Sequence, residues 1–187
     1  DPNLAMMGAK LSQSGQLVNT IDVSDQARLS ASHGLVPAAL FFDQEEDPGA
    51  NINHSAPSAL LRTMEGVAAT IELSGNSLTL ELPAPGLHNG VDATLALAMA
   101  DVMVDDGLQA DRVATAMAGG APVFGRGEVI TYRGRQIALT MMKNLPSLQV
   151  NLDALEGPLE RAWMSVDEGT PDPQWIYEAD ISALAHV

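Results

Sequence analysis

Two basic residues flank a predicted β-hairpin in the second half of the chain. Arg126 stands between two glycines before the first strand, and Lys143 follows the second strand. Because the free ends of two antiparallel strands lie side by side, we expect both cations to emerge at the same end of the hairpin. The chain holds 9 Lys and Arg against 24 Asp and Glu, so two neighbouring cations indicate an anion site. A solvated rim of unrelated charges explains the spacing equally well.

A second candidate group lies where a long helix is expected to begin. The spacing of apolar residues predicts a helix over residues 90–106, with Asn89 as its N-cap and Asp92 completing a capping box. Its buried face is expected to consist of Val91, Leu95, Ala98, Met99 and Val102. Amide groups exposed at a helix N-terminus can also meet a bound ligand. His88 and Asn89 are therefore candidates both for capping and for ligand binding.

Acidic residues near the end of the chain form a third candidate group. Asp167, Glu168 and Asp172 crowd a turn that precedes the aromatic residues Trp175 and Tyr177. A carboxylate beside exposed aromatic side chains could act as a catalytic acid or face a partner protein. Aspartate next to proline more often simply forms a turn. Another acidic stretch, residues 43–57, is interpreted as a solvated loop, and its histidine is assigned no role.

Composition excludes several classes of function. The net charge of −15 argues against nucleic acid or an anionic membrane as a partner. The absence of cysteine excludes disulfides and thiolate metal sites. No apolar run reaches the roughly 18 residues that span a bilayer, and no signal peptide opens the chain. We therefore expect a soluble cytosolic protein without an integral membrane segment. Because the sequence opens on Asp1-Pro2, we expect it to be a fragment.

The elements that must position these residues alternate between strands and helices, which predicts an α/β protein. Strands are expected at 16–23, 37–42, 68–73, 77–82 and 161–166, and on both sides of an Arg133-Gly134 turn. Gly75-Asn76 is the expected turn of the earlier hairpin. Helices are expected at 3–14, 58–64, 111–117 and 146–155, and near Ile181. In the later hairpin, Val129, Thr131, Ile137, Leu139 and Met141 are expected to share a buried face.

Several segments, taken in order, resemble a Mur ligase. They are Asp1-Pro2, PGLHNGVDATLALAMA (85–100), FGRGE (124–128) and LTMMKN (139–144). With WMSVDEGTPDPQWIYEADISAL (163–184), they are most similar to the Mur-ligase-like subunit of lipid II isoglutaminyl synthase. The resemblance extends to about Leu184. It implies the end of the central ATPase domain over residues 1–122 and the start of a Rossmann-like C-terminal domain over residues 123–187.

The resemblance implies an ATP-dependent carbon–nitrogen ligase of peptidoglycan synthesis. Its substrate would be the D-glutamate α-carboxylate of lipid II, activated as an acyl phosphate and amidated to D-isoglutamine. A glutaminase subunit, in a heterodimer, would supply the ammonia from glutamine at the inner face of the membrane. ATP and Mg²⁺ are the implied cofactors. Their phosphate loop and metal ligands are expected upstream of this chain, which alone should not hydrolyse ATP.

The resemblance also implies roles for single residues in the nucleotide site. Arg126 would contact the ribose and phosphates, Asn89 would lie near the adenine, and Lys143 would face the transferred phosphate. His88 and Asp92 belong to the same expected site, Asp92 standing where the family has a second asparagine.

Two more residues complete the implied set. Asn144 is expected to bind the nucleotide beside Lys143, and Asp172 is expected to reach the glutaminase and orient its catalytic histidine. Two alternatives remain open at the level of sequence: a Mur-type ligase that adds an amino acid, and a non-catalytic Mur-like interaction module.

Overall fold

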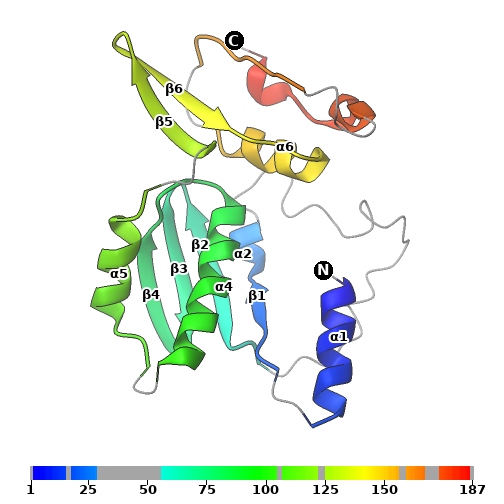
Figure 1. Ribbon diagram of the computed structural model, residues 1–187, viewed down its shortest axis with the longest axis vertical. Coiled ribbons are helices and arrows are strands. Elements are labelled where there is room, and N and C mark those ends of the chain that lie inside the picture. The colour runs from blue at the N-terminus through cyan, green and yellow to red at the C-terminus, as the bar shows by residue number, and fades with distance from the viewer. Residues whose placement is uncertain are drawn as a thin grey trace.

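The structure, a computed structural model, describes residues 2–15, 18–28, 56–104, 107–121, 125–155, 159–166 and 173–185. The expected strand at 37–42, almost all of the 43–57 loop, and Asp167, Glu168 and Asp172 lie outside these residues. The described elements combine a mixed sheet with helices, which confirms the α/β class (Figure 1). The proposed division at residue 122 stays a prediction.

A four-stranded sheet forms the larger part of the molecule. Its strands are β1 (Ile21–Val23), β2 (Ala59–Glu65), β3 (Ala68–Leu73) and β4 (Asn76–Glu81), in that order. β1 runs parallel to β2, and the other pairs are antiparallel. The β3–β4 hairpin is confirmed, but its turn lies one residue earlier than expected. Ser74 and Gly75 both have positive φ (48° and 82°), as the favoured two-residue hairpin turn requires.

The helix expected over 58–64 is wrong, because this segment is β2, a central strand of the sheet. Its side chains alternate between a buried and a more exposed face. Ala59 and Leu61 are buried, and Arg62, which follows Leu61, is exposed. A register shift after Leu61 returns Met64 to the buried face. The leucines and methionine of the segment favour helix locally. Pairing with strands on both sides overrides that weak preference.

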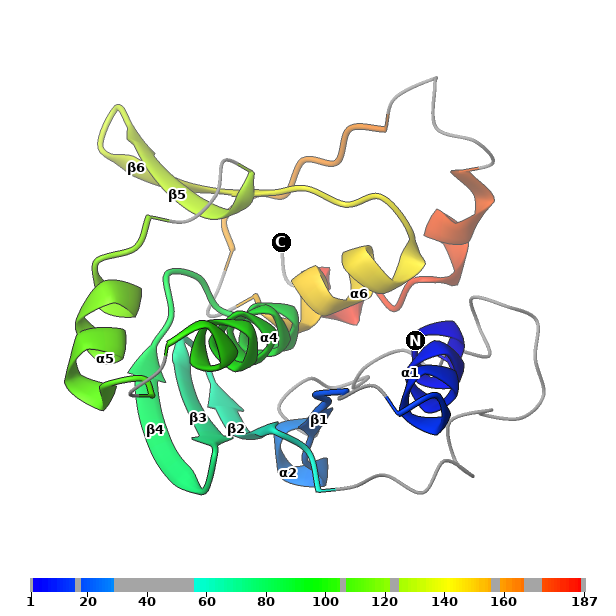
Figure 2. The same ribbon diagram turned by 60° about the horizontal axis from the view of Figure 1, so that its bottom comes forward.

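Helix α4 (Leu87–Met103) packs across the sheet against β2, and α5 (Ala110–Ala118) packs against β4 (Figures 1 and 2). The core between them contains Leu61, Ile71, Leu80, Leu87 and Leu97, among others. A Cβ atom at Gly90 would lie only 2.9 Å from Leu61 Cδ2, so the helix sits very close to the sheet.

The face of α4 that packs on the sheet agrees only in part with the expected one: Ala98 is buried and Val91 is partly buried against the core, as expected. Leu95, Met99 and Val102 are 46%, 60% and 65% exposed. The buried stripe instead follows Leu87, Gly90, Ala93, Thr94, Leu97 and Ala98. Small residues in this stripe allow the close approach, so it faces the sheet even though the neighbouring stripe carries larger apolar side chains.

The second part of the molecule begins with a two-stranded hairpin, β5 (Arg126–Tyr132) and β6 (Arg135–Thr140). Its expected turn is confirmed, with Arg133 and Gly134 at φ 52° and 77°. The expected shared face is wrong. Val129 pairs with Ala138, which puts Val129 and Ile137 on opposite faces; both side chains are substantially exposed. A two-stranded ribbon has no second layer that could bury one face.

Helix α6 (Leu145–Asp153) and two 3₁₀ helices, η1 (Pro173–Glu178) and η2 (Ser182–Leu184), complete the described chain. Buried Gln149 accepts a hydrogen bond from the Asp180 amide (2.9 Å) and donates one to the Asp180 carbonyl (3.2 Å), which ties the last segment to α6. The strand expected at 161–166 is wrong. No described strand pairs with this extended segment, and Trp163 is 92% exposed.

The remaining expectations agree with the structure to within a few residues. Helix α1 (Pro2–Gln13) ends before Gly15, whose φ is 82°. The helices expected at 111–117 and 146–155 are α5 and α6, and η2 lies near Ile181 as a 3₁₀ helix. The first expected strand is shorter than residues 16–23, because only β1 forms among its described residues.

Candidate anion-binding site at the start of helix α4

The open end of the β5–β6 hairpin packs against the segment that leads into α4. The register shifts between Arg126 and Glu128, so Gly127 forms a bulge with φ 79°. A Cβ atom at Gly127 would lie 3.0 Å from Ala84 Cβ and 3.8 Å from Pro85 Cδ. The bulge therefore holds the start of β5 directly beside the chain that enters the helix, as Figure 1 shows.

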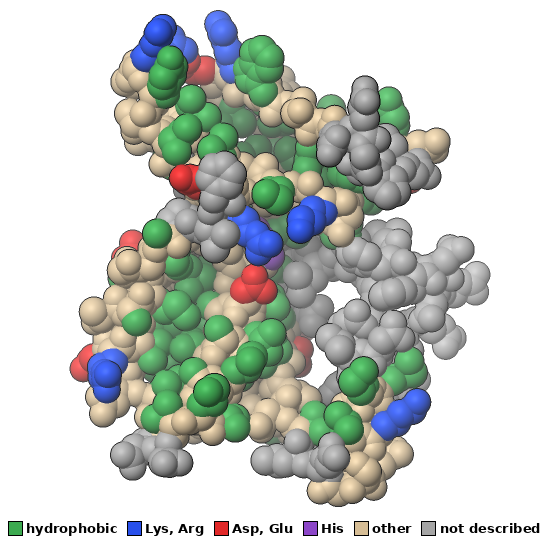
Figure 3. All heavy atoms as spheres, in the orientation of Figure 1, with side chains coloured by type: hydrophobic (Ala, Val, Ile, Leu, Met, Phe, Trp, Pro, Cys, Tyr) green, Lys and Arg blue, Asp and Glu red, His purple; other side chains and the backbone are tan. Residues whose placement is uncertain are grey.

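This packing brings Arg126 to the first turn of α4. Burial lowers the pKa of His88 below its ordinary value of 6.5; the Asp92 carboxylate opposes this shift, and the Arg126 guanidinium adds to it. A residue of the hairpin and a residue of the helix thus act on the same imidazole. Figure 3 shows basic and acidic side chains close together where the hairpin meets the start of α4. Charges from two distant parts of the sequence meet here.

Gly86 makes room for the imidazole. It is the N-cap of α4, with φ 107°, and a Cβ atom there would lie 2.9 Å from His88 Cε1 and 3.0 Å from its Nδ1. The expected cap at Asn89 is therefore wrong: Asn89 lies in the first turn, and its Nδ2 donates to the Pro85 carbonyl (2.7 Å). A glycine with positive φ reverses the chain earlier than the asparagine would.

The same asparagine assigns the protonation of His88. Asn89 Nδ2 lies 3.3 Å from His88 Nε2. With the amide as donor, Nε2 accepts and the imidazole proton belongs on Nδ1. Nδ1 is buried and has no hydrogen-bond partner among the described residues. A second proton would have to bind Nε2, which already accepts a hydrogen bond from Asn89 Nδ2. Protonation is therefore disfavoured, in agreement with the lowered pKa of His88.

Two basic side chains, Arg126 and Lys143, stand at this end of the hairpin. Within the part of the chain that the structure describes, neither the Arg126 guanidinium nor the Lys143 ammonium makes a hydrogen bond or an ion pair. Arg62 and Arg135, by contrast, pair with glutamates at 2.7 Å and 2.9 Å. Arg126 pairs with Thr140 across the hairpin, and Thr140 precedes Lys143 by a few residues in the sequence. The arrangement leaves both positive groups available to an anion.

Asn144 acts as the N-cap of α6. Its Oδ1 accepts a hydrogen bond from the Ser147 amide (3.0 Å), and Ser147 Oγ accepts one from the Asn144 amide (3.1 Å). This capping box fixes the backbone just after Lys143, whose own amide also donates to Ser147 Oγ (2.8 Å). The assignment of Asn144 to a nucleotide stays a prediction. So does the assignment of Asp172, which lies outside the described residues.

Neither a three-ligand metal cluster nor a membrane-spanning helix occurs in the ranges that the structure covers. Within them, no group of three or more His, Asp or Glu side chains is arranged to hold a metal ion. No helix in those ranges has both the length and the apolar character to cross a membrane.

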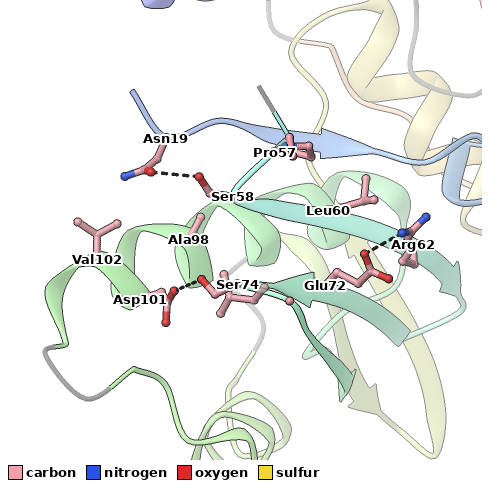
Figure 4. A pocket seen from close by; sticks show the side chains of 13 residues that line it. Asn19, Pro57, Ser58, Leu60, Arg62, Glu72, Ser74, Ala98, Asp101 and Val102 are labelled. Carbon is pink, nitrogen blue, oxygen red and sulfur yellow. Dashed lines mark hydrogen bonds and ion pairs between the residues drawn. The ribbon is translucent and has the colours of Figure 1, made fainter. Parts of the chain in front are cut away.

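A groove of about 490 Å³ lies at the other end of α4 (Figure 4). Its polar side chains bond to one another: Ser74 Oγ donates to Asp101 Oδ2 (2.6 Å), and Ser58 Oγ donates to Asn19 Oδ1 (3.0 Å). Asp101 also accepts from the Leu108 amide (3.3 Å). The two bonds to Asp101 tie the β3–β4 turn and the α4–α5 connection to the helix. No sequence motif had marked them, because they join residues far apart in the chain.

A smaller hollow of about 100 Å³ adjoins the start of α4, between Gly86-Leu87 and Asp153-Ala154. The lining of neither hollow includes His88, Asn89 or Arg126. Neither hollow therefore coincides with the candidate anion site.

Comparison with protein-family models and with curated protein sequences finds no match. Among solved structures, the chain is similar to a pseudomurein peptide ligase type C from Methanothermus fervidus, at 19% identity and a TM-score of 0.47. The alignment covers 57% of this chain and 22% of that one. The chain thus spans about a fifth of that structure's length. Likeness at this level says nothing about the activity or substrate of this chain.

Proposed function

We propose that this chain is part of a Mur-type ATP-dependent ligase and that the cations at the open end of the hairpin meet the phosphates of the nucleotide. One observation carries the proposal: the Gly127 bulge packs on Ala84 at the entry to α4, which brings the neighbouring Arg126 close enough to His88 to influence its pKa. The family resemblance assigns Arg126 and His88 to the same ligand. A shared nucleotide site requires Arg126 and His88 to lie close together. Unrelated charges at the rim of the hairpin would have no reason to lie beside the helix start.

The chemistry of phosphoryl transfer explains why such cations are needed. Negative charge develops on the transferred phosphoryl group, and fixed guanidinium and ammonium groups stabilise it. In this proposal Arg126 binds the ribose and phosphates, and Lys143 faces the phosphoryl group that moves. Asn89 donates through its Nδ2, which leaves its amide oxygen to accept a hydrogen bond from the adenine amino group. The phosphate loop and the Mg²⁺ ligands belong to other parts of the complete enzyme.

The specific reaction proposed is amidation of the lipid II D-glutamate at the cytoplasmic face of the membrane. The γ-phosphoryl group passes to an α-carboxylate oxygen as its bond to ADP breaks. Ammonia from a glutaminase subunit then attacks the acyl carbon, phosphate leaves, and the nitrogen gives up a proton. Support comes from the resemblance of residues 163–184. Within that stretch Trp163 and Tyr177 are 92% and 90% exposed, and aromatic residues of this kind commonly anchor protein interfaces.

Nucleotide protection tests the ligase proposal. We expect the complete protein to gain thermal stability when ATP and Mg²⁺ are added, because a ligand that binds only the folded state raises the melting temperature. Arg126→Ala should remove most of that gain. Arg112→Ala is the matched control, because Arg112 is an exposed arginine on α5. An equal shift in all three proteins would contradict the assignment of Arg126.

The partner assignment needs a separate test. Asp172→Asn should abolish amidation driven by glutamine and spare amidation driven by added ammonium, because the carboxylate is proposed to act on the glutaminase. Product formation from both nitrogen sources is measured with the complete ligase and its partner. Loss of both activities to the same extent would place Asp172 in the ligase centre or in the fold.

A further inference from the structure

Three glycines of the hairpin region have positive φ but differ in what surrounds them. Gly125, Gly127 and Gly134 have φ values of 69°, 79° and 77°. A Cβ atom at Gly134 would meet nothing within 4 Å, and one at Gly125 would lie 3.5 Å from Met141 Cε, an ordinary contact. At Gly127 the added atom would lie 3.0 Å from Ala84 Cβ. Only at Gly127 does a side chain meet both a disfavoured backbone conformation and a contact too close to keep.

Ala84 has little freedom to move away. It is 4% exposed and lies between Pro83 and Pro85, whose rings restrict the backbone on both sides. Pro83 is exposed, but a Cβ atom at Gly120 would lie 2.9 Å from its Cγ, so Pro83 rests against the chain just after α5 on that side. If a side chain were added at Gly127, the hairpin would have to move and not the segment that enters α4.

We propose that Gly127 is a positioning residue: its missing side chain lets the bulge of β5 rest against Ala84, and this contact holds Arg126 beside the first turn of α4. Gly127 itself would not contact the ligand. It sets the distance between the hairpin, which carries the cation, and the helix start, which carries His88 and Asn89. The ligand is a nucleotide's phosphates only if the proposed function is correct; the positioning itself can be tested without a nucleotide.

The test uses variants of the complete protein. Gly127→Ala adds the methyl group, and Gly134→Ala is the matched control, because it imposes the same positive-φ strain in the same hairpin without a contact. Ala84→Gly combined with Gly127→Ala removes the opposing methyl group. Two quantities are measured: the pKa of His88 by NMR titration, with His88→Gln used to assign the signal, and the Kd for ATP with Mg²⁺.

We expect Gly127→Ala to raise the pKa of His88, because Arg126 lowers it in the wild-type protein and would move away. ATP affinity should fall roughly tenfold or more, since a charge-assisted hydrogen bond is lost. Gly134→Ala should change neither quantity. The Ala84→Gly, Gly127→Ala double variant should return both toward wild type. A merely structural role for Gly127 would not produce this rescue of the imidazole pKa.

The outcomes separate the two proposals. A raised and rescued His88 pKa without any ATP binding to the wild-type protein would uphold the positioning role and overturn the nucleotide assignment. An unchanged His88 pKa in folded Gly127→Ala, or an equal change in Gly134→Ala, would overturn the positioning role. If Gly127→Ala does not fold, recovery of folding by Ala84→Gly supports the contact, and failure to recover overturns it.

Discussion

Leu61 lies at the centre of the packing between β2 and α4, and its truncation tests how closely the two elements meet. Its side chain is 0% exposed, and Gly90 of the helix lies directly over it. Leu61→Ala removes buried methyl groups and leaves a cavity. Gly90 has no side chain that could lean into that cavity. We therefore expect a loss of about 3–5 kcal/mol in the free energy of unfolding, the upper part of the range for such substitutions.

A second substitution makes the expectation specific to this contact. Gly90→Ala adds a methyl group 2.9 Å from Leu61 Cδ2. Overpacking of this kind costs about 1–3 kcal/mol, against which alanine gains about 1 kcal/mol in helix propensity. In the Leu61→Ala background the clash with Leu61 disappears and the propensity gain remains. The other close contact, 3.1 Å from the added atom to Met64 Sδ, involves the end of a flexible side chain that can move aside. The double variant should thus be more stable than Leu61→Ala alone by about 1 kcal/mol.

Urea unfolding followed by circular dichroism at 222 nm (the helical band) measures these differences. Leu60→Ala is the matched control, because Leu60 is the adjacent leucine of β2 but lines the open groove. It should cost about 1 kcal/mol or less. The reasoning would be refuted if the two alanine variants lost similar stability, or if Gly90→Ala changed stability equally in the two backgrounds.

Two further predictions follow from buried polar groups. Burial lowers the pKa of His88, so below its ordinary value of 6.5 the unfolded chain binds more protons than the folded protein. The stability that neutral His88 contributes should be complete above about pH 6.5 and should fall as the pH drops toward the folded-state pKa. Urea midpoints measured at about pH 7.5 and about pH 5 should therefore differ less in His88→Gln than in wild type. An identical difference in the two proteins would contradict the prediction. Gln149→Ala should cost about 1–3 kcal/mol, because Asp180 loses its two backbone bonds to that side chain. The exposed Gln136→Ala should cost almost nothing by the same unfolding assay, and equal costs would show that the Gln149 bonds do not stabilise the fold.

Local signals in the sequence were sufficient for the elements whose structure is locally determined. The Arg133-Gly134 turn and the helix that begins around Pro146 follow from turn and capping chemistry. Signals that depend on the partner of an element were not sufficient. The β2 segment resembles a helix until strands pair with it on both sides, and the faces of the hairpin depend on a register that alternation along one strand does not reveal.

The candidate site shows the same limit. The sequence placed Arg126 and Lys143 at the same end of the hairpin and placed Asn89 near a helix start. It did not reveal that Gly86 would displace Asn89 as the cap. Nor did it reveal that Gly127 would pack on Ala84, because that contact exists only once the chain has folded.

The affinity of the complete protein for ATP with Mg²⁺, measured by isothermal titration calorimetry in wild type, Arg126→Ala and Arg112→Ala, tests the central claim most directly. If Arg126 binds the phosphates, its loss should weaken binding roughly tenfold or more, while Arg112→Ala binds as wild type does. Equal affinity in all three proteins, or no binding by the wild type, would contradict the claim.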